Sequence, residues 1–103
     1  MTYNLIITER ADELLDKLVI YLLYQLKNEK AASHLLSSIS KIYDRVAENP
    51  FQFPQCRDTA LKRKEYREVV IPDMNYVVIY KINEDTVYIL GVFHGLENYN
   101  QKI

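Results

Sequence analysis

The sequence predicts an α+β fold in which a hairpin of two helices packs on one face of a mainly antiparallel four-stranded sheet. Two observations support this fold class. Apolar residues recur every three or four positions across residues 8–49, and three short runs rich in β-branched and aromatic residues follow in the second half of the chain. A further apolar run opens the chain at residues 3–7. The predicted order is therefore β-α-α-β-β-β, arranged in two layers.

Both helices have recognisable ends in the sequence. Thr8 is the predicted N-cap of the first helix, which carries acidic residues in its first turn and ends near Lys27. Asn28 can leave the helical path, and the second helix then continues to Asn49-Pro50, because the residue before a proline avoids the helical region. The apolar stripe of the first helix comprises Ala11, Leu14, Leu15, Leu18, Val19, Leu22 and Leu26, and that of the second comprises Ala32, Leu35, Leu36, Ile39, Ile42, Tyr43 and Val46.

The second half of the chain is predicted to form the rest of the sheet. Residues 50–64 are expected to be a loop with two prolines. The three strands are residues 66–71, 76–82 and 86–93, joined by turns at Pro72-Asp73 and Asn83-Glu84-Asp85. Short links between strands favour an antiparallel meander, and its apolar face needs the cover that the helical hairpin can supply.

The composition describes a folded protein of nearly balanced charge. The chain has 103 residues, of which 49% are hydrophobic, enough to build one core in a single domain spanning residues 1–103. Its 13 basic and 14 acidic residues give a formal net charge of −1. Domains that coat nucleic acid by bulk electrostatics are usually clearly basic, so this balance argues against that class and leaves room only for a local basic patch.

The single cysteine, Cys56, excludes an internal disulfide and a thiolate metal cluster, which fits a reducing cytoplasm. The first residues lack the pattern of a signal peptide, and no apolar run approaches the ~20 residues of a membrane span. Phosphate-binding loops, metal-ligand spacings and serine-hydrolase motifs are absent from the sequence. We therefore expect a cytoplasmic protein with no metal, no cofactor and no membrane partner, in which Cys56 is inert.

Six pieces of the chain, in order, carry a resemblance to a known family. They are Ile7-Thr8, the acidic leucine-rich helix with Tyr21 in its middle, Glu48-Asn49-Pro50-Phe51, Tyr66-Arg67, the run Tyr76-Val77-Val78-Ile79-Tyr80-Lys81-Ile82, and Val92-Phe93-His94-Gly95. This series covers nearly the whole chain and resembles the RelE/ParE superfamily of toxins from bacterial toxin–antitoxin modules. The ParE-like, or plasmid stabilisation, branch is the most similar, because His-Gly commonly ends the last strand there.

The resemblance implies two alternative activities. RelE-like members are ribosome-dependent messenger-RNA endonucleases, whereas ParE-like members poison DNA gyrase and have no known catalytic constellation of their own. Both are held inactive by a small cognate antitoxin in a toxin–antitoxin hetero-oligomer. The antitoxin wraps around the toxin as an extended or helical peptide, so the apolar helical face and the sheet edge are the expected contact surfaces.

Three residues match the requirements of the nuclease alternative, which needs a cation for the phosphorane and groups that move protons at the 2′- and 5′-oxygens. Arg67 matches the arginine that opens the second strand in both branches. His94 is the candidate acid or base, since imidazole titrates near neutral pH. Tyr99 resembles the C-terminal tyrosine of the nuclease branch. Structural roles stay open for all three: a strand arginine, a partner-contacting histidine and a tyrosine that packs the tail.

A compact basic run, Lys62, Arg63 and Lys64, precedes Arg67. Across residues 56–67, five basic side chains stand against two acidic ones. The four basic residues 62–64 and 67 are candidates for contact with phosphates or with an acidic antitoxin segment. A solvated loop is the alternative.

Two features weigh against the nuclease. Leu96, Glu97 and Asn98 follow the His-Gly pair where the family usually places arginine, and Glu97 would repel a phosphate. Tyr76 stands where several nuclease members open the third strand with arginine. We therefore expect a toxin that binds an essential target, which the resemblance to the ParE-like branch implies to be DNA gyrase. The alternatives are an RNA endonuclease acting with the ribosome and messenger RNA, or a decayed toxin that titrates the antitoxin.

Overall fold

The computed structural model describes residues 2–95 and 99–103. The strands are β1 (Asn4–Ile7), β2 (Arg67–Val70), β3 (Tyr76–Asn83) and β4 (Thr86–His94), and the α-helices are α1 (Glu9–Ile20), α2 (Glu29–Glu48) and α3 (Thr59–Arg63). A π-helical turn, Tyr21–Gln25, extends α1, and short 3-10 helices occupy Pro50–Gln52 and Tyr99–Gln101. The predicted α+β class and element order are confirmed, with α3 as an addition.

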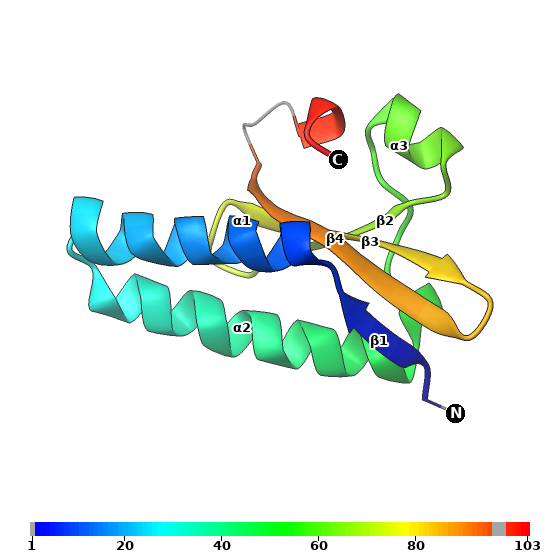
Figure 1. The fold of residues 1–103 in the computed structure, drawn as a ribbon, viewed down its shortest axis with the longest axis horizontal. Coiled ribbons are helices and arrows are strands. Elements are labelled where there is room, and N and C mark those ends of the chain that lie inside the picture. The colour runs from blue at the N-terminus through cyan, green and yellow to red at the C-terminus, as the bar shows by residue number, and fades with distance from the viewer. Residues whose placement is uncertain (1, 96–98) are drawn as a thin grey trace.

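The strands form one sheet in the order β1-β4-β3-β2 (Figure 1). β1 pairs with β4 in parallel, whereas β2 with β3 and β3 with β4 are antiparallel, so the sheet is mainly antiparallel as predicted. Helix α1 supplies part of the crossover that a parallel pair requires. The register of β3 against β4 shifts between Ile79 and Tyr80, where Gly91 and Ile89 are the successive partners.

The turn between the helices differs in detail from the prediction. The Leu26 N–H donates to the Tyr21 carbonyl at 3.1 Å, five residues back, which widens the last turn. Lys27, with φ 49°, leaves the helical path one residue before Asn28, whose backbone (φ −117°, ψ 84°) is also non-helical as predicted. Asn28 also caps α2 by accepting from the Ala31 N–H at 3.0 Å. The predicted caps at Thr8 and Asn49-Pro50 are both present.

The segment 50–64 is more ordered than the predicted loop. Asp58 accepts a hydrogen bond from the Leu61 N–H at 3.0 Å and so caps the single-turn helix α3. Leu61 is fully buried beneath it. The missed signal was an aspartate three residues before a leucine, which is the spacing of an N-cap and its first buried side chain.

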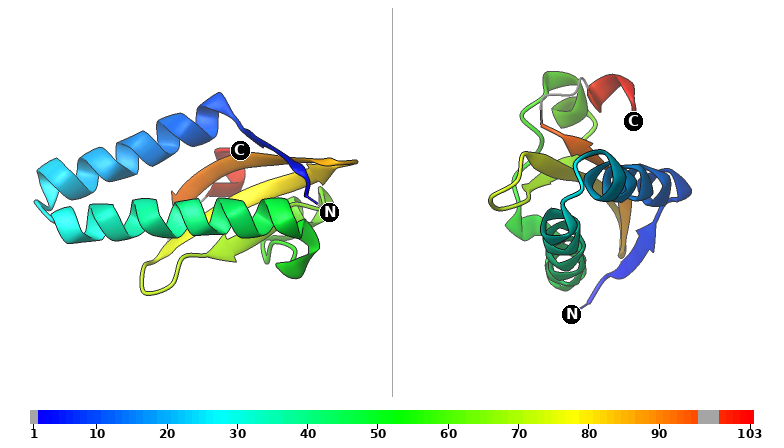
Figure 2. Two further views of the ribbon diagram at one scale, coloured as in Figure 1. Left: turned by 90° about the horizontal axis from the view of Figure 1, so that it is seen from below. Right: turned by 90° about the vertical axis from the view of Figure 1, so that its left-hand side faces the viewer.

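Helices α1 and α2 lie side by side over one face of the sheet, as Figures 1 and 2 show from three directions. The main core fills the space between them. Its fully or nearly fully buried members include Ala11, Leu22, Leu35, Ile39, Val46, Val78, Tyr80, Val87, Ile89 and Val92. No helix in residues 2–95 or 99–103 combines the length and the apolar character needed to cross a bilayer.

The opposite face of the sheet holds a second, smaller core. Alternate residues of β3, Val77 and Ile79, point into it together with Phe93 of β4. Cys56 and Leu61 cover these side chains, and Tyr99 and Ile103 pack at the margin. In Figure 1, α3 and the C-terminal turn lie together on the side of the sheet away from α2. β3 is thus buried on both faces.

Candidate functional site

Arg67 opens β2 and is held by its neighbours. Its Nη1 donates to the Phe53 carbonyl at 2.5 Å, and its guanidinium carbon lies 5.2 Å from the centre of the Phe51 ring. Across the sheet it pairs with Tyr80, whose buried hydroxyl donates to the Pro50 carbonyl at 2.5 Å. Arg67 therefore fastens the segment after α2 to the sheet.

An open depression of about 350 Å³ adjoins Arg67. Its lining residues are Phe51, Gln55, Glu65, Arg67, Ile82 and Glu84. Two carboxylates therefore share this space with one guanidinium, so the local charge is negative at neutral pH. Such a lining disfavours a phosphate, which would need an excess of cations.

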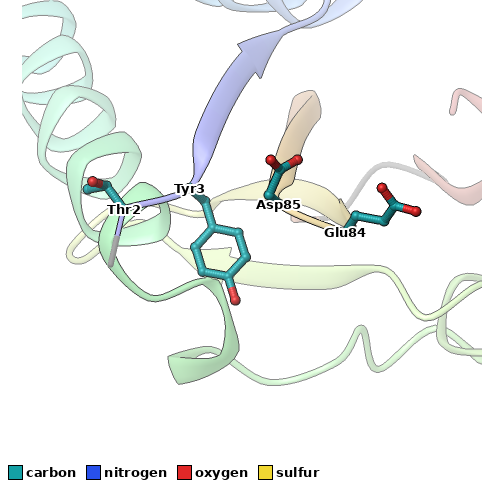
Figure 3. Close-up of a pocket in the computed structure, with 4 residues that line it drawn as sticks. All are labelled: Thr2, Tyr3, Glu84 and Asp85. Carbon is teal, nitrogen blue, oxygen red and sulfur yellow. The ribbon is translucent and has the colours of Figure 1, made fainter.

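A second, smaller depression lies at the turn between β3 and β4. Thr2, Tyr3, Glu84 and Asp85 line it, and Figure 3 shows the two carboxylates projecting from the turn. The Tyr3 ring meets Phe51 edge-on, with centroids 6.3 Å apart. Glu84 lines both depressions, so this end of the sheet carries acidic and aromatic side chains.

His94 ends β4 and lies opposite Tyr76 of β3. The two rings meet edge to face, with centroids 5.6 Å apart and an interplanar angle of 83°. Residues 96–98, which include the Leu96, Glu97 and Asn98 that weighed against a nuclease, lie outside the described residues.

Tyr99 packs on the second core. Its ring stacks on Phe93, with centroids 5.6 Å apart and an interplanar angle of 24°. Burial raises the pKa of the Tyr99 phenol, and the carboxylate of Glu68 raises it further. A packed phenol with a raised pKa fits a structural role, in which the Tyr99 ring covers the second core.

The structure does not bring the three nuclease candidates together. Arg67 and His94 pair with Tyr80 and Tyr76, four residues apart on β3, which separates them by about 13 Å along the strand. Tyr99 stacks on Phe93, the strand neighbour of His94, and neighbouring residues of a strand point to opposite faces. Arg67, His94 and Tyr99 thus lie at two ends and on two faces of the sheet.

The basic run lies at the end of α3. Lys62 and Arg63 occupy its last turn and are exposed, and the Nζ of Lys64 lies 5.7 Å from the centre of the Tyr66 ring. Arg57, which added to the local positive charge in the sequence, is paired. Its Nε lies 3.0 Å from Oε2 of Glu68.

Cys56 is 1% exposed, and burial raises its pKa to about 12, helped by the carboxylates of Glu68 and Asp58. A thiol in this state is a poor nucleophile. Among the described residues, no group of three or more histidine, cysteine, aspartate or glutamate side chains is arranged to hold a metal ion.

The closed end of the helical hairpin carries a patch that the apolar stripes did not predict. We call it the hairpin tip; its exposed apolar residues are Ile20, Tyr21, Tyr24, Leu26 and Leu36. Leu26 and Leu36 were assigned to core-facing stripes, yet they are 52% and 47% exposed. Figures 1 and 2 show the reason: this end of the hairpin extends beyond the sheet, so no layer covers it.

Comparisons with known proteins agree with this architecture. Residues 5–99 match the family model of the ParE toxin of the type II toxin–antitoxin system parDE. A solved structure described as the chromosomal ParDE toxin–antitoxin system from P. aeruginosa has the same fold, with a TM-score of 0.72 and 13% sequence identity. The match covers 90% of this chain and 96% of that one. No curated protein sequence matches the chain.

The fold and the site define a small α+β protein with exposed apolar and charged surfaces and with its predicted catalytic candidates dispersed. Because the family model spans nearly the whole chain, the protein belongs to the ParE toxin family of type II toxin–antitoxin systems.

Proposed function

We propose that this protein is a growth-inhibiting toxin that acts in the cytoplasm by binding DNA gyrase and is neutralised by a cognate antitoxin. Membership of the ParE toxin family supports the toxin role. The observation that favours binding over catalysis is the dispersal of Arg67, His94 and Tyr99. A nuclease needs such groups within hydrogen-bond reach of one phosphodiester, whereas an inhibitor needs only a complementary surface.

The hairpin tip is the surface we assign to the antitoxin. Tyr24 is 72% exposed and Ile20 is 55% exposed, and both belong to residue types that dominate interface energetics or pack readily into a partner. Several large apolar side chains exposed at one end of a small protein favour an interaction site there. The outer edge of β1, where Ile6 and Ile7 are also partly exposed, is a second surface that an extended peptide can use.

The target is tested by induced expression in a bacterial host with pulse labelling of DNA and protein synthesis. A gyrase poison stops DNA synthesis first and raises the SOS response. If translation stops first and messages are cut at codon boundaries, the protein is a ribosome-dependent endonuclease instead. A host that grows normally at high toxin level points to a decayed toxin.

The antitoxin surface is tested with Tyr24→Ser at the hairpin tip. Val70→Ser on β2 is the matched control, because Val70 is also an exposed apolar residue, at 54% exposure, but lies on the edge strand opposite β1 and away from the hairpin tip. We expect Tyr24→Ser to weaken the complex with the small protein encoded beside the toxin gene at least tenfold in calorimetry, as for an interface hot spot. If Tyr24→Ser bound that small protein as tightly as Val70→Ser does, the antitoxin would bind elsewhere.

A further inference from the structure

A row of aromatic and basic side chains crosses the face of the sheet opposite the helical hairpin. Lys81 of β3 lies opposite Tyr88 of β4, and Tyr88 lies opposite Ile6 of β1. All three point away from the main core, because the residues next to them in their strands pack into it: Tyr80 beside Lys81, Val87 and Ile89 beside Tyr88, and Leu5 beside Ile6. Tyr66, just before β2, packs at the margin of the second core on this same face.

A lysine ammonium group lies over the ring of each tyrosine in this row. The Nζ of Lys81 lies 5.3 Å from the centre of the Tyr88 ring, and the Nζ of Lys64 lies 5.7 Å from that of Tyr66. Tyr66 and Tyr88 flank β3 on either side, two strand spacings or about 10 Å apart. The ring–ammonium unit is therefore repeated across the sheet, and we call these four residues the tyrosine–lysine row.

Glu68, the acidic residue of β2 on this face, is already paired with another side chain. Glu68 shares the face but is 3% exposed and bound by Arg57. Glu65 lines the depression beside Arg67. Lys62 and Arg63, at the end of α3, are exposed and precede Lys64 in sequence. Four basic side chains, those of Lys62, Arg63, Lys64 and Lys81, thus lie on or next to this face, and the exposed acids nearest to them in sequence are Glu65 and, at the turn after β3, Glu84 and Asp85.

We propose that the tyrosine–lysine row binds single-stranded nucleic acid, with bases against the two tyrosine rings and phosphates at the two ammonium groups. Proteins that bind single strands without sequence preference combine aromatic platforms with a basic track, which is the pattern of this row. A duplex keeps its bases stacked internally and cannot use the rings. An acidic peptide would use the lysines but would gain little from the rings, so the paired arrangement favours nucleic acid.

This surface is separate from the hairpin tip, and the inference goes beyond the proposed function. A failure of the row to bind nucleic acid would leave the antitoxin and gyrase assignments unaffected. A failure of those assignments would likewise leave the row in place. The two can therefore be tested independently on the same purified chain.

The test is fluorescence anisotropy of labelled mixed-sequence single-stranded DNA and RNA, titrated with the whole protein at about 50 and about 200 mM salt. Lys64→Gln/Lys81→Gln should weaken binding at least tenfold and reduce the salt slope by about 1.4, the value for two phosphates on a single strand. Tyr88→Leu, which keeps an apolar side chain of lower stacking power, should weaken binding at least about fivefold.

The matched control is Lys17→Gln/Lys30→Gln, which makes the same charge change at exposed positions of α1 and α2. It should leave the affinity within about twofold. Circular dichroism establishes that every variant is folded. In a second series, unlabelled single strand, duplex DNA or polyglutamate is added as a competitor to the complex with the labelled oligonucleotide.

Three results would overturn the proposal. One is no binding of either single strand at low salt. Another is an equal loss for the row and the control variants. The third is that polyglutamate or duplex DNA competes as strongly as the unlabelled single strand and that Tyr88→Leu leaves the affinity unchanged. The row would then be a general anion-binding surface.

Discussion

Arg57 binds both carboxylate oxygens of Glu68: its main-chain N–H donates to Oε1 at 2.9 Å and its Nε donates to Oε2 at 3.0 Å. Glu68 is 3% exposed, whereas the Arg57 side chain is 79% exposed. One residue at the surface thus supplies both donors to a buried carboxylate. This pair joins the segment before α3 to β2 above the second core.

Replacing the buried carboxylate should cost more than removing the exposed guanidinium. In Glu68→Gln, whichever way the amide turns, one of the two Arg57 donors loses its acceptor, which costs about 1–3 kcal/mol. Arg57→Ala keeps the main-chain bond, and because the Arg57 side chain is 79% exposed, water can enter the space that it leaves and solvate Oε2 of Glu68, so the cost should be about 1 kcal/mol or less. Urea denaturation measures both, with Glu65→Gln as an exposed control. A larger loss in Arg57→Ala than in Glu68→Gln would contradict this account.

The protein should lose stability in alkaline solution. Burial raises the pKa of the Cys56 thiol to about 12 from an ordinary 9.0, and that of the Tyr43 phenol to about 12 from 10.0; the pKa of Tyr80 is raised as well. The unfolded chain releases these protons at lower pH than the folded chain. The stabilisation is therefore complete below about pH 9 and falls as the pH rises towards 12.

Cys56→Ala separates the thiol from the phenols. Without the thiol, the decline in the free energy of unfolding should begin near pH 10, the ordinary pKa of tyrosine, instead of near pH 9. Urea titrations at a series of pH values measure the onset. An onset at the same pH in both proteins would exclude the thiol as a contributor.

Arg67 should matter for stability more than for any chemical step. Arg67→Lys keeps the charge but loses the planar group that lies over Phe51 and reaches the Phe53 carbonyl, at a cost of about 1 kcal/mol. We expect growth inhibition by Arg67→Lys and by His94→Ala to stay within about tenfold of the parent at matched protein level, well short of the loss expected for a catalytic group. Growth at graded inducer with immunoblotting measures this, and a loss of several orders of magnitude in either would support the nuclease.

Gly91 permits a close approach of β4 to its surroundings. A Cβ at this position would lie 2.5 Å from the Phe93 ring and 3.0 Å from Leu14 of α1. Phe93 is fully buried and stacked on Tyr99, so it has little room to move. Gly91→Ala should therefore destabilise the fold by about 1–3 kcal/mol.

A second substitution checks the cause of that loss. Phe93→Leu shortens the side chain that the new methyl group meets, so adding Gly91→Ala to it should cost clearly less than adding it to the parent. The coupling is read from a double-mutant cycle by thermal or urea unfolding. Additive losses would mean that the methyl group clashes elsewhere.

Much of the fold could be predicted because its signals are local. The helical period gave α1 and α2, the residue before Pro50 gave the end of α2, and β-branched runs gave β2, β3 and β4. The short helix α3 was missed because five residues are too few for a period to appear. The register shift at Gly91 was missed because it depends on how β4 pairs with β3.

The candidate site was less predictable, since it depends on contacts between distant segments. Arg67, His94 and Tyr99 were chosen one by one for their chemistry, and no sequence spacing states which face or end of a sheet each occupies. The exposure of Leu26 and Leu36 was not predicted for the same reason, because it depends on tertiary contacts. Their period is correct for a helix that has a partner layer, but the hairpin tip has none.

The sequence by itself determined the order of the elements and most of their ends, because caps, prolines and apolar periods act within a few residues, and its ordered series of motifs carried the resemblance to the toxin family. Only the tertiary structure decided that Arg67 fastens a loop, that Tyr99 covers a second core and that Tyr66, Lys81 and Tyr88 share one face. Those outcomes depend on strand order and register, which are fixed by the burial of side chains far apart in the chain.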